Sequence, residues 1–200
     1  MLIYILRTDF CNKNRRLIRD NLLSHVLYEN YGLNLSNAEI DRNEYGKPYL
    51  INWPNIFFNI SYSINFIACS IGRGEHGVDC EKVRSFDYYV AQRAFSKSEQ
   101  QMLKNSEDKE KFFFSIWTLK ECLGKAKGTG LNYDLRKTTF VINYDSISCS
   151  DDSFNYKTFE LRNGYMLSIA TKEAIEDIEI KEVVMENGEL NNVRQSVQKI

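Results

Sequence analysis

Two carboxylates separated by one residue, Asp79 and Glu81, are the clearest candidates for chemistry in this chain. They lie in the segment 77–81, whose residue pattern predicts a strand. Side chains two residues apart on a strand point to the same face, so both carboxylates project together. Such a pair suits Mg²⁺, which takes one or two protein oxygens and completes its shell with water and substrate phosphate. A solvated polar strand face is the simpler interpretation of this pair alone.

A second group of reactive residues falls at helical spacing. Trp117, Glu121 and Lys125 are four residues apart, so on a helix of about 3.6 residues per turn they lie along one ridge. An aromatic ring, an acid and a base then face the same space, and Lys120 lies about a quarter-turn away. An ordinary surface pair between Glu121 and Lys125, with the tryptophan packed in the core, explains this pattern more simply when it stands alone.

A third group could hold a phosphate. Lys47 stands in the turn 46–48, and the hydroxyl side chains of 61–63 lie at the end of a predicted strand. A lysine in a turn can act with hydroxyls at a strand end to bind phosphate through charge-assisted hydrogen bonds. By itself this signal is weak.

Hydrophobic spacing predicts the elements that must position these groups. Apolar residues recur at helical spacing over 14–31 and 108–127, and Gly32 and Gly128 are the predicted stops. Ser96 and Glu99 form a capping-box pattern that predicts another helix start. Each half of the chain thus has a long helix and several strands, which predicts an α+β fold with two similar lobes. The predicted strands cover 1–7, 56–61, 66–71, 77–81, 139–142, 156–161, 165–171 and 178–184.

Composition narrows the class of protein. The chain has 200 residues, 43% of them hydrophobic, which is enough for a buried core. Its formal net charge of −1 argues against a nucleic-acid partner. No apolar run approaches the ~20 residues that a membrane span requires, and the first residues lack the pattern of a signal peptide. Five scattered cysteines form no CxxC pair, which favours a reducing compartment, so we expect a cytoplasmic protein.

The joint order of these groups resembles the signature of the 4′-phosphopantetheinyl transferases, in particular the Sfp type, which is pseudo-dimeric and activates peptide and polyketide synthetases. The family pattern runs G-K-P, F-N-x-S-H-S, G-(I/V)-D-(I/V)-E, F-S-x-x-E and W-x-x-K-E-x-x-x-K. Each piece is a weak signal, whereas the compound signal is strong and extends over about two-thirds of the chain. The matching segments are 46–48, 58–63, 77–81, 95–99 and 117–125.

The resemblance implies two like α/β lobes related by a pseudo-twofold axis, each a long helix packed on a small antiparallel sheet. The active site would lie in the cleft between an N-terminal lobe, residues 1–83, and a C-terminal lobe, residues 84–200. Because one chain supplies both lobes, we expect a monomer.

The resemblance also implies a reaction. A serine hydroxyl of an apo acyl or peptidyl carrier protein attacks the β-phosphorus of coenzyme A, giving holo carrier protein and 3′,5′-ADP (holo-[acyl-carrier-protein] synthase activity). Mg²⁺ and nearby lysines would neutralise charge at the phosphorus. The implied metal ligands are Asp79, Glu81 and Glu121; the implied contacts to coenzyme A are Arg15, Lys47, Ser61, Tyr62, Lys120 and Lys125; the implied catalytic residues are Glu121 and Lys125, with Glu121 or a metal-bound hydroxide as the base.

Two departures from the family pattern bear on the binding of coenzyme A. Tyr62 stands where the family usually has His, and its hydroxyl can donate a hydrogen bond but carries no charge. We therefore expect weaker binding of coenzyme A rather than lost chemistry. The basic loop that often precedes the first helix is reduced here, and Arg15 best matches one of its basic positions.

Two other classes of function use the same residues. A metal-dependent phosphodiesterase or nuclease could use Asp79, Glu81 and Lys82, but the near-zero net charge speaks against a nucleic-acid substrate. A non-catalytic module that binds coenzyme A or a carrier protein is supported by Tyr62 alone. The presence of all three expected metal ligands argues against that module.

Overall fold

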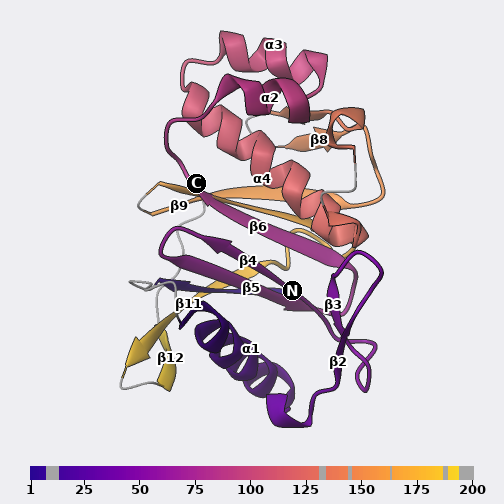
Figure 1. Cartoon of the computed structure of the whole chain (residues 1–200), viewed down its shortest axis with the longest axis vertical. Coiled ribbons are helices and arrows are strands. Elements are labelled where there is room, and N and C mark those ends of the chain that lie inside the picture. Colours follow the sequence, from indigo (N-terminus) through magenta and orange to yellow (C-terminus); the bar gives the residue numbers. More distant parts are fainter. Residues whose placement is uncertain (8–13, 131–133, 144–145, 163, 187–188, 194–200) are drawn as a thin grey trace.

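Four layers make up the molecule in the computed structural model, which describes residues 1–7, 14–130, 134–143, 146–162, 164–186 and 189–193. From bottom to top in Figure 1, these layers are the helix α1, a five-stranded sheet, a three-stranded sheet and the helix α4. The expected α+β class, with one long helix on each sheet, is confirmed. Among the described residues, no helix combines the length and the apolar character that crossing a membrane would need.

The structure has the following elements in its described residues. The α-helices are α1 (Arg15–Tyr31), α2 (Tyr88–Ala94), α3 (Lys97–Asn105) and α4 (Lys109–Lys127), and the short 3₁₀ turns are η2 (Leu35–Asn37) and η4 (Leu135–Lys137). The strands are β1 (Leu2–Arg7), β2 (Ile40–Arg42), β3 (Pro48–Leu50), β4 (Phe57–Ser63), β5 (Phe66–Gly72), β6 (His76–Lys82), β7 (Phe140–Ile142), β8 (Ile147–Cys149), β9 (Asn155–Leu161), β10 (Tyr165–Thr171), β11 (Glu179–Glu186) and β12 (Glu189–Val193).

The two long helices end where the sequence predicts. Gly32 follows α1 and Gly128 follows α4, each in the left-handed conformation that glycine adopts without steric cost. The apolar stripe of α1 is buried against the five-stranded sheet. Helix α3 begins with the expected capping box, in which Ser96 and Glu99 satisfy each other's backbone N–H groups. Local chemistry therefore sets the ends of these helices.

The sheets exchange strands between the two halves of the chain. The order of the five-stranded sheet is β12-β11-β1-β5-β4, and that of the three-stranded sheet is β6-β10-β9. The last strands thus return to the first half of the fold, as the yellow ribbon in Figure 1 shows. The division expected at residue 83 separates α1 from α4 but not the sheets. One expectation needs correction, because β1 pairs with β11 in parallel and the larger sheet is therefore mixed.

Strand β6 is held on two sides by different means. On one side it pairs with β10 through a backbone ladder. On the other side it lies next to β4, which belongs to the other sheet, and three side chains of β4 bond to its backbone. Asn59, Ser61 and Ser63 accept hydrogen bonds from the N–H groups of Val78, Cys80 and Lys82, at 3.0, 3.2 and 3.0 Å. We call this contact the β4–β6 seam.

Helix α4 approaches β6 closely because Gly77 has no side chain. A Cβ atom at this position would overlap the backbone of Cys122 and of Ala126. Successive residues of a strand point to opposite faces, so Asp79 shares the face of Gly77 that α4 covers. Cys80 points the other way, into the core between the two sheets. The missing side chain at Gly77 thus allows α4 to lie close to Asp79.

We predict that Gly77→Ala lowers the free energy of unfolding by about 1–3 kcal/mol, because α4 has to shift outward to accept the methyl group. Denaturant unfolding followed by circular dichroism measures this change. Gly74→Ala is the matched control, since its Cβ would meet side-chain atoms of Glu173 and Lys172, the nearest at 3.3 Å, and no backbone atom closer than these. Equal stability of the two variants would contradict the close packing of α4 on β6.

Candidate active site

Asp79 lies at the centre of the site. Its side chain is almost buried, and its Oδ1 atom accepts hydrogen bonds from the Ser61 hydroxyl and the Lys125 ammonium, each at 2.7 Å. Its Oδ2 atom is buried and has no hydrogen-bond partner among the described residues. A buried carboxylate oxygen without a hydrogen-bond partner lowers the stability of the fold unless some further group binds to it.

Glu81 projects from the same face of β6 but has different partners. Its Oε2 atom accepts hydrogen bonds from the Ser63 hydroxyl and from Arg84, both at 3.1 Å. Arg84 is exposed and also lies over the ring of Phe114, with 5.0 Å between guanidinium and ring centre. Glu81 is therefore more accessible than Asp79 and is already paired with a cation.

Glu121 supplies the third carboxylate from α4. Burial raises its pKa to about 7, and the carboxylates of Asp79 and Glu81 add to the rise, against the opposing effect of Lys125. Its Oε1 atom is buried and, like Asp79 Oδ2, has no hydrogen-bond partner in the described part of the chain. Strand and helix are joined at this point, because Lys125, one turn after Glu121 on α4, bonds to Asp79 on β6 at 2.7 Å.

The three carboxylates are expected to hold a divalent cation, and two of them each offer a buried oxygen for it in this structure. Within the described ranges, no three His, Cys, Asp or Glu side chains form a ready-made metal cage. Asp79 and Glu121, however, each hold one buried oxygen without a described partner. Mg²⁺ binds through one or two carboxylates and takes its other ligands from water and phosphate, so this pair of oxygens suits it. Glu81 is paired with Arg84 here, and the expected set of Asp79, Glu81 and Glu121 as metal ligands stays a prediction.

Two lysines link α4 to β6 on either side of Gly77. The Lys125 ammonium donates to Val78 O at 3.1 Å as well as to Asp79. The Lys47 ammonium donates to His76 O and Ala126 O, both at 3.0 Å, and burial lowers its pKa to about 8. Lys125 therefore lies at the carboxylates and Lys47 lies farther along β6.

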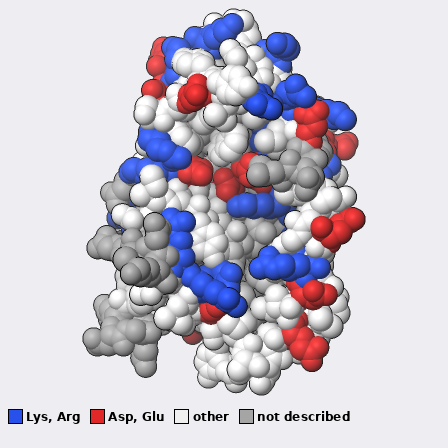
Figure 2. Space-filling model, in the orientation of Figure 1, with Lys and Arg blue, Asp and Glu red and all other residues white. Residues whose placement is uncertain are grey.

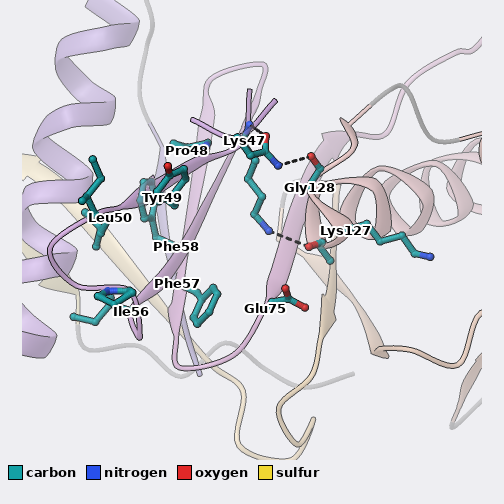
Figure 3. A pocket seen from close by; sticks show the side chains of 14 residues that line it. Lys47, Pro48, Tyr49, Leu50, Ile56, Phe57, Phe58, Glu75, Lys127 and Gly128 are labelled. Carbon is teal, nitrogen blue, oxygen red and sulfur yellow. Dashed lines mark hydrogen bonds between the residues drawn. The ribbon is translucent and has the colours of Figure 1, made fainter. Parts of the chain in front are cut away.

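A pocket of about 450 Å³ opens beside Lys47. Figure 3 shows the Lys47 side chain extending toward the end of α4, with Pro48, Tyr49, Phe57 and Phe58 together on the opposite side. Glu75 lies at the far end of the same pocket. Aromatic and aliphatic walls with a few polar groups at the margin are typical of ligand-binding pockets.

Lys120 does not face this site, and its expected contact with a pyrophosphate needs correction. Its side chain is completely buried, and the ammonium pairs with Glu99 at 2.9 Å. It also donates to Leu135 O at 2.7 Å and Thr138 O at 2.6 Å. An ammonium has three N–H groups, so these partners account for all of them. Lys120 therefore joins α4 to α3 and to the loop that leads to β7.

Ser61 and Tyr62 do not converge on one group, because neighbours on a strand point to opposite faces. Ser61 bonds to Asp79, whereas the phenol of Tyr62 faces Arg19 of α1, and burial raises its pKa. Arg15 is exposed at the start of α1. The contacts expected from Arg15, Ser61 and Tyr62 to coenzyme A stay predictions.

Sequence reasoning did not predict that Ser63 and Arg84 contact the carboxylate of Glu81. The signal for Ser63 was present, since it repeats Ser61 two residues later on the same strand face. Arg84 lies three residues after Glu81, but the sequence does not show that the chain turns there. Figure 2 shows acidic side chains at the centre of this face, with lysine and arginine side chains around a hollow below them.

We predict that burial of Glu121 makes stability depend on pH in the absence of divalent cations. Its pKa is about 7 in the folded protein against an ordinary value of 4.5, so the folded state favours the protonated form. This contribution to stability is complete below pH 4.5 and is lost as the pH rises through about 7. Thermal unfolding in EDTA should therefore show wild type losing stability relative to Glu121→Gln across this range. If the difference in unfolding temperature between wild type and Glu121→Gln does not change with pH, Glu121 does not have the raised pKa.

We predict that Lys120→Met lowers the free energy of unfolding by about 3–5 kcal/mol, because it leaves the buried Glu99 carboxylate without its cation. Urea unfolding provides the measurement. The exposed Lys104 of α3 offers a control, since Lys104→Met should change stability by less than about 0.5 kcal/mol. A loss at Lys120 no larger than that of the control would show that the pair is not structural.

Comparisons with known proteins identify the family. The family model described as the 4′-phosphopantetheinyl transferase superfamily matches residues 75–181, just over half of the chain. The 4′-phosphopantetheinyl transferase Sfp of Bacillus subtilis is 31% identical over 163 residues, which cover 78% of this chain and 73% of the relative. The 4′-phosphopantetheinyl transferase psf-1 of Bacillus pumilus is 28% identical over 188 residues, covering 90% and 81%.

Among solved structures, the holo-[acyl-carrier-protein] synthase of Thermotoga maritima superposes with a TM-score of 0.42 at 20% identity, over 48% of this chain and 61% of that protein. The resemblance drawn from the motifs is confirmed by the family model and by the sequence relatives. The chain therefore belongs to the 4′-phosphopantetheinyl transferase superfamily.

Proposed function

We propose that this transferase moves the 4′-phosphopantetheine group of coenzyme A onto a serine of an apo acyl or peptidyl carrier protein. The observation that carries this proposal is the pair of buried, unpartnered oxygens on Asp79 and Glu121 beside the Lys125 ammonium, as far as the described residues extend. Two anionic oxygens and one cation can bind a metal-chelated pyrophosphate, which a purely structural cluster would not need.

Coenzyme A would lie along β6 with its nucleotide and its pyrophosphate at different lysines. The nucleotide end would occupy the pocket beside Lys47, whose apolar walls suit a purine ring. The pyrophosphate would lie at Lys125 and Asp79. His76, which bonds to Lys47, and Asp79 are three residues apart, so about 10 Å of strand separates the two positions. That length suits an extended nucleotide that presents its pyrophosphate to the carboxylates.

The transfer needs a proton acceptor and charge neutralisation. The serine oxygen of the carrier forms a bond to the β-phosphorus, the bond from that phosphorus to the bridging oxygen breaks, and 3′,5′-ADP leaves with the bridging oxygen. Lys125 would neutralise charge that develops on the departing phosphate. Bound Mg²⁺ would supply further charge neutralisation on the pyrophosphate.

Glu121 is the base that we propose for the serine proton. A carboxylate next to a metal ion is normally a poor base, because the cation lowers its pKa. Burial and the nearby Asp79 act in the opposite direction, since both raise the pKa of Glu121. Glu81 would join the cation or steer the substrate once its contact with Arg84 is broken.

We propose that one chain is sufficient to form the active site and that the protein is a cytoplasmic monomer. Ser61, Asp79, Glu81, Glu121 and Lys125 come from β4, β6 and α4 of a single polypeptide, and Lys47 comes from the turn before β3 of the same chain. The described cysteines Cys69, Cys80, Cys122 and Cys149 are free thiols, which supports a reducing compartment.

We predict that the wild-type protein, incubated with coenzyme A, Mg²⁺ and an apo carrier protein, adds the mass of one phosphopantetheine group to the carrier. Mass spectrometry of the carrier provides the measurement. EDTA or Asp79→Ala should abolish the gain, and Glu121→Gln should lower kcat by about 10²–10⁴-fold if it removes the general base.

Lys104→Met is the control for this assay. Lys104 is an exposed residue of α3, whereas the carboxylates lie on β6 and α4, so this variant should transfer at the wild-type rate. Cleavage of a phosphodiester substrate without carrier modification would instead favour a metal-dependent phosphodiesterase. Binding of coenzyme A without any turnover would favour a non-catalytic module.

A further inference from the structure

We propose that Ser61 and Ser63 of β4 are positioning residues that set the orientation of the carboxylates of Asp79 and Glu81. This inference rests on the proposed function, because it concerns the same acidic site. The two serines make the same arrangement twice, two residues apart, so the contact repeats along the β4–β6 seam rather than occurring once.

Each serine hydroxyl bonds to two groups of β6. Ser61 donates to Asp79 Oδ1 at 2.7 Å and accepts the N–H of Cys80 at 3.2 Å. Ser63 donates to Glu81 Oε2 at 3.1 Å and accepts the N–H of Lys82 at 3.0 Å. In both cases the hydroxyl joins a carboxylate to the N–H of the residue that follows it.

These two hydrogen bonds at each serine, one donated and one accepted, fix the direction of its hydroxyl. A serine has one proton to donate, and the N–H that it accepts determines which way the remaining lone pair and proton point. Ser61 and Ser63 are almost buried, so water cannot readily replace either of them. Because Ser61 and Lys125 both bind Oδ1 of Asp79, they leave Oδ2 as the oxygen without a described partner. The hydroxyl thus selects which oxygen of Asp79 is available.

Asn59 provides an internal contrast on the same strand. Its Oδ1 accepts the N–H of Val78 at 3.0 Å, so it contributes to the seam as the serines do. The residue before Val78, at the position that Asp79 and Glu81 occupy relative to the N–H partners of the serines, is Gly77, which has no side chain to orient. Loss of Asn59 therefore tests the seam alone, whereas loss of Ser63 tests the seam together with the orientation of Glu81.

The arrangement also makes the acidic site depend on both halves of the fold. Strand β4 belongs to the sheet that α1 covers, and β6 belongs to the sheet that α4 covers. A shift between the two sheets would move both serines relative to both carboxylates. Groups that orient metal ligands in this way commonly change metal affinity by 10–100-fold when they are removed.

The experiment compares Ser63→Ala, Ser63→Thr and Asn59→Ala with wild type. Electron paramagnetic resonance of free Mn²⁺ measures metal binding to the protein alone, and the Mg²⁺ dependence of transfer is measured separately. We expect Ser63→Ala to raise the Kd for Mn²⁺ and the half-saturating Mg²⁺ concentration by about tenfold, with kcat at saturating Mg²⁺ within about twofold of wild type. Ser63→Thr keeps the hydroxyl and should restore both values.

Asn59→Ala should lower the unfolding temperature but leave the Kd for Mn²⁺ unchanged. The proposal is overturned if Ser63→Ala binds Mn²⁺ as wild type does, or if Asn59→Ala weakens binding as much as Ser63→Ala. If Ser63→Ala does not fold, the same comparison is made with Ser61→Ala at Asp79. Since Mn²⁺ binding needs no carrier protein, failure of wild type to modify any carrier would overturn the proposed function and leave this result standing.

Discussion

The position of strand β6 is the constraint on which the rest of the structure depends. A backbone ladder to β10 holds one edge, and side chains of β4 hold the other. Helix α4 packs against its face at Gly77, where a side chain would collide with the helix backbone. Because β6 carries Asp79 and Glu81 while α4 carries Glu121 and Lys125, one strand brings all four groups together.

Burial then determines the charges of these groups. The interior favours neutral forms, so Glu121 has a raised pKa and Lys47 a lowered one. Both ammonium groups are hydrogen-bonded, since Lys47 donates to two backbone carbonyls and Lys125 donates to one carbonyl and to Asp79. Lys120 shows the opposite use of the same residue type, since its buried pair with Glu99 stabilises the helices rather than the site. Partners, not residue type, decide the role of each lysine.

The sequence could predict the elements whose ends depend on nearby residues. The capping box at Ser96 and the glycines after α1 and α4 act within one or two turns, so their patterns are sufficient. The exchange of strands was not predictable in this way, because β1 pairs with β11 from the far end of the chain. Strand pairing depends on which distant segments meet, and a hydrophobic pattern does not record the partner.

The candidate site also has features that local spacing predicts and features that only tertiary packing decides. Residue type and spacing determined by themselves that Asp79 and Glu81 share a strand face and that Glu121 and Lys125 share a helix ridge, since both follow from local periodicity. Only the tertiary structure decided that Lys120 turns into the core, that Arg84 pairs with Glu81, and that Ser61 and Ser63 bind the carboxylates. Those contacts join segments far apart in sequence or require a turn of the chain, and their distances follow from packing rather than from spacing.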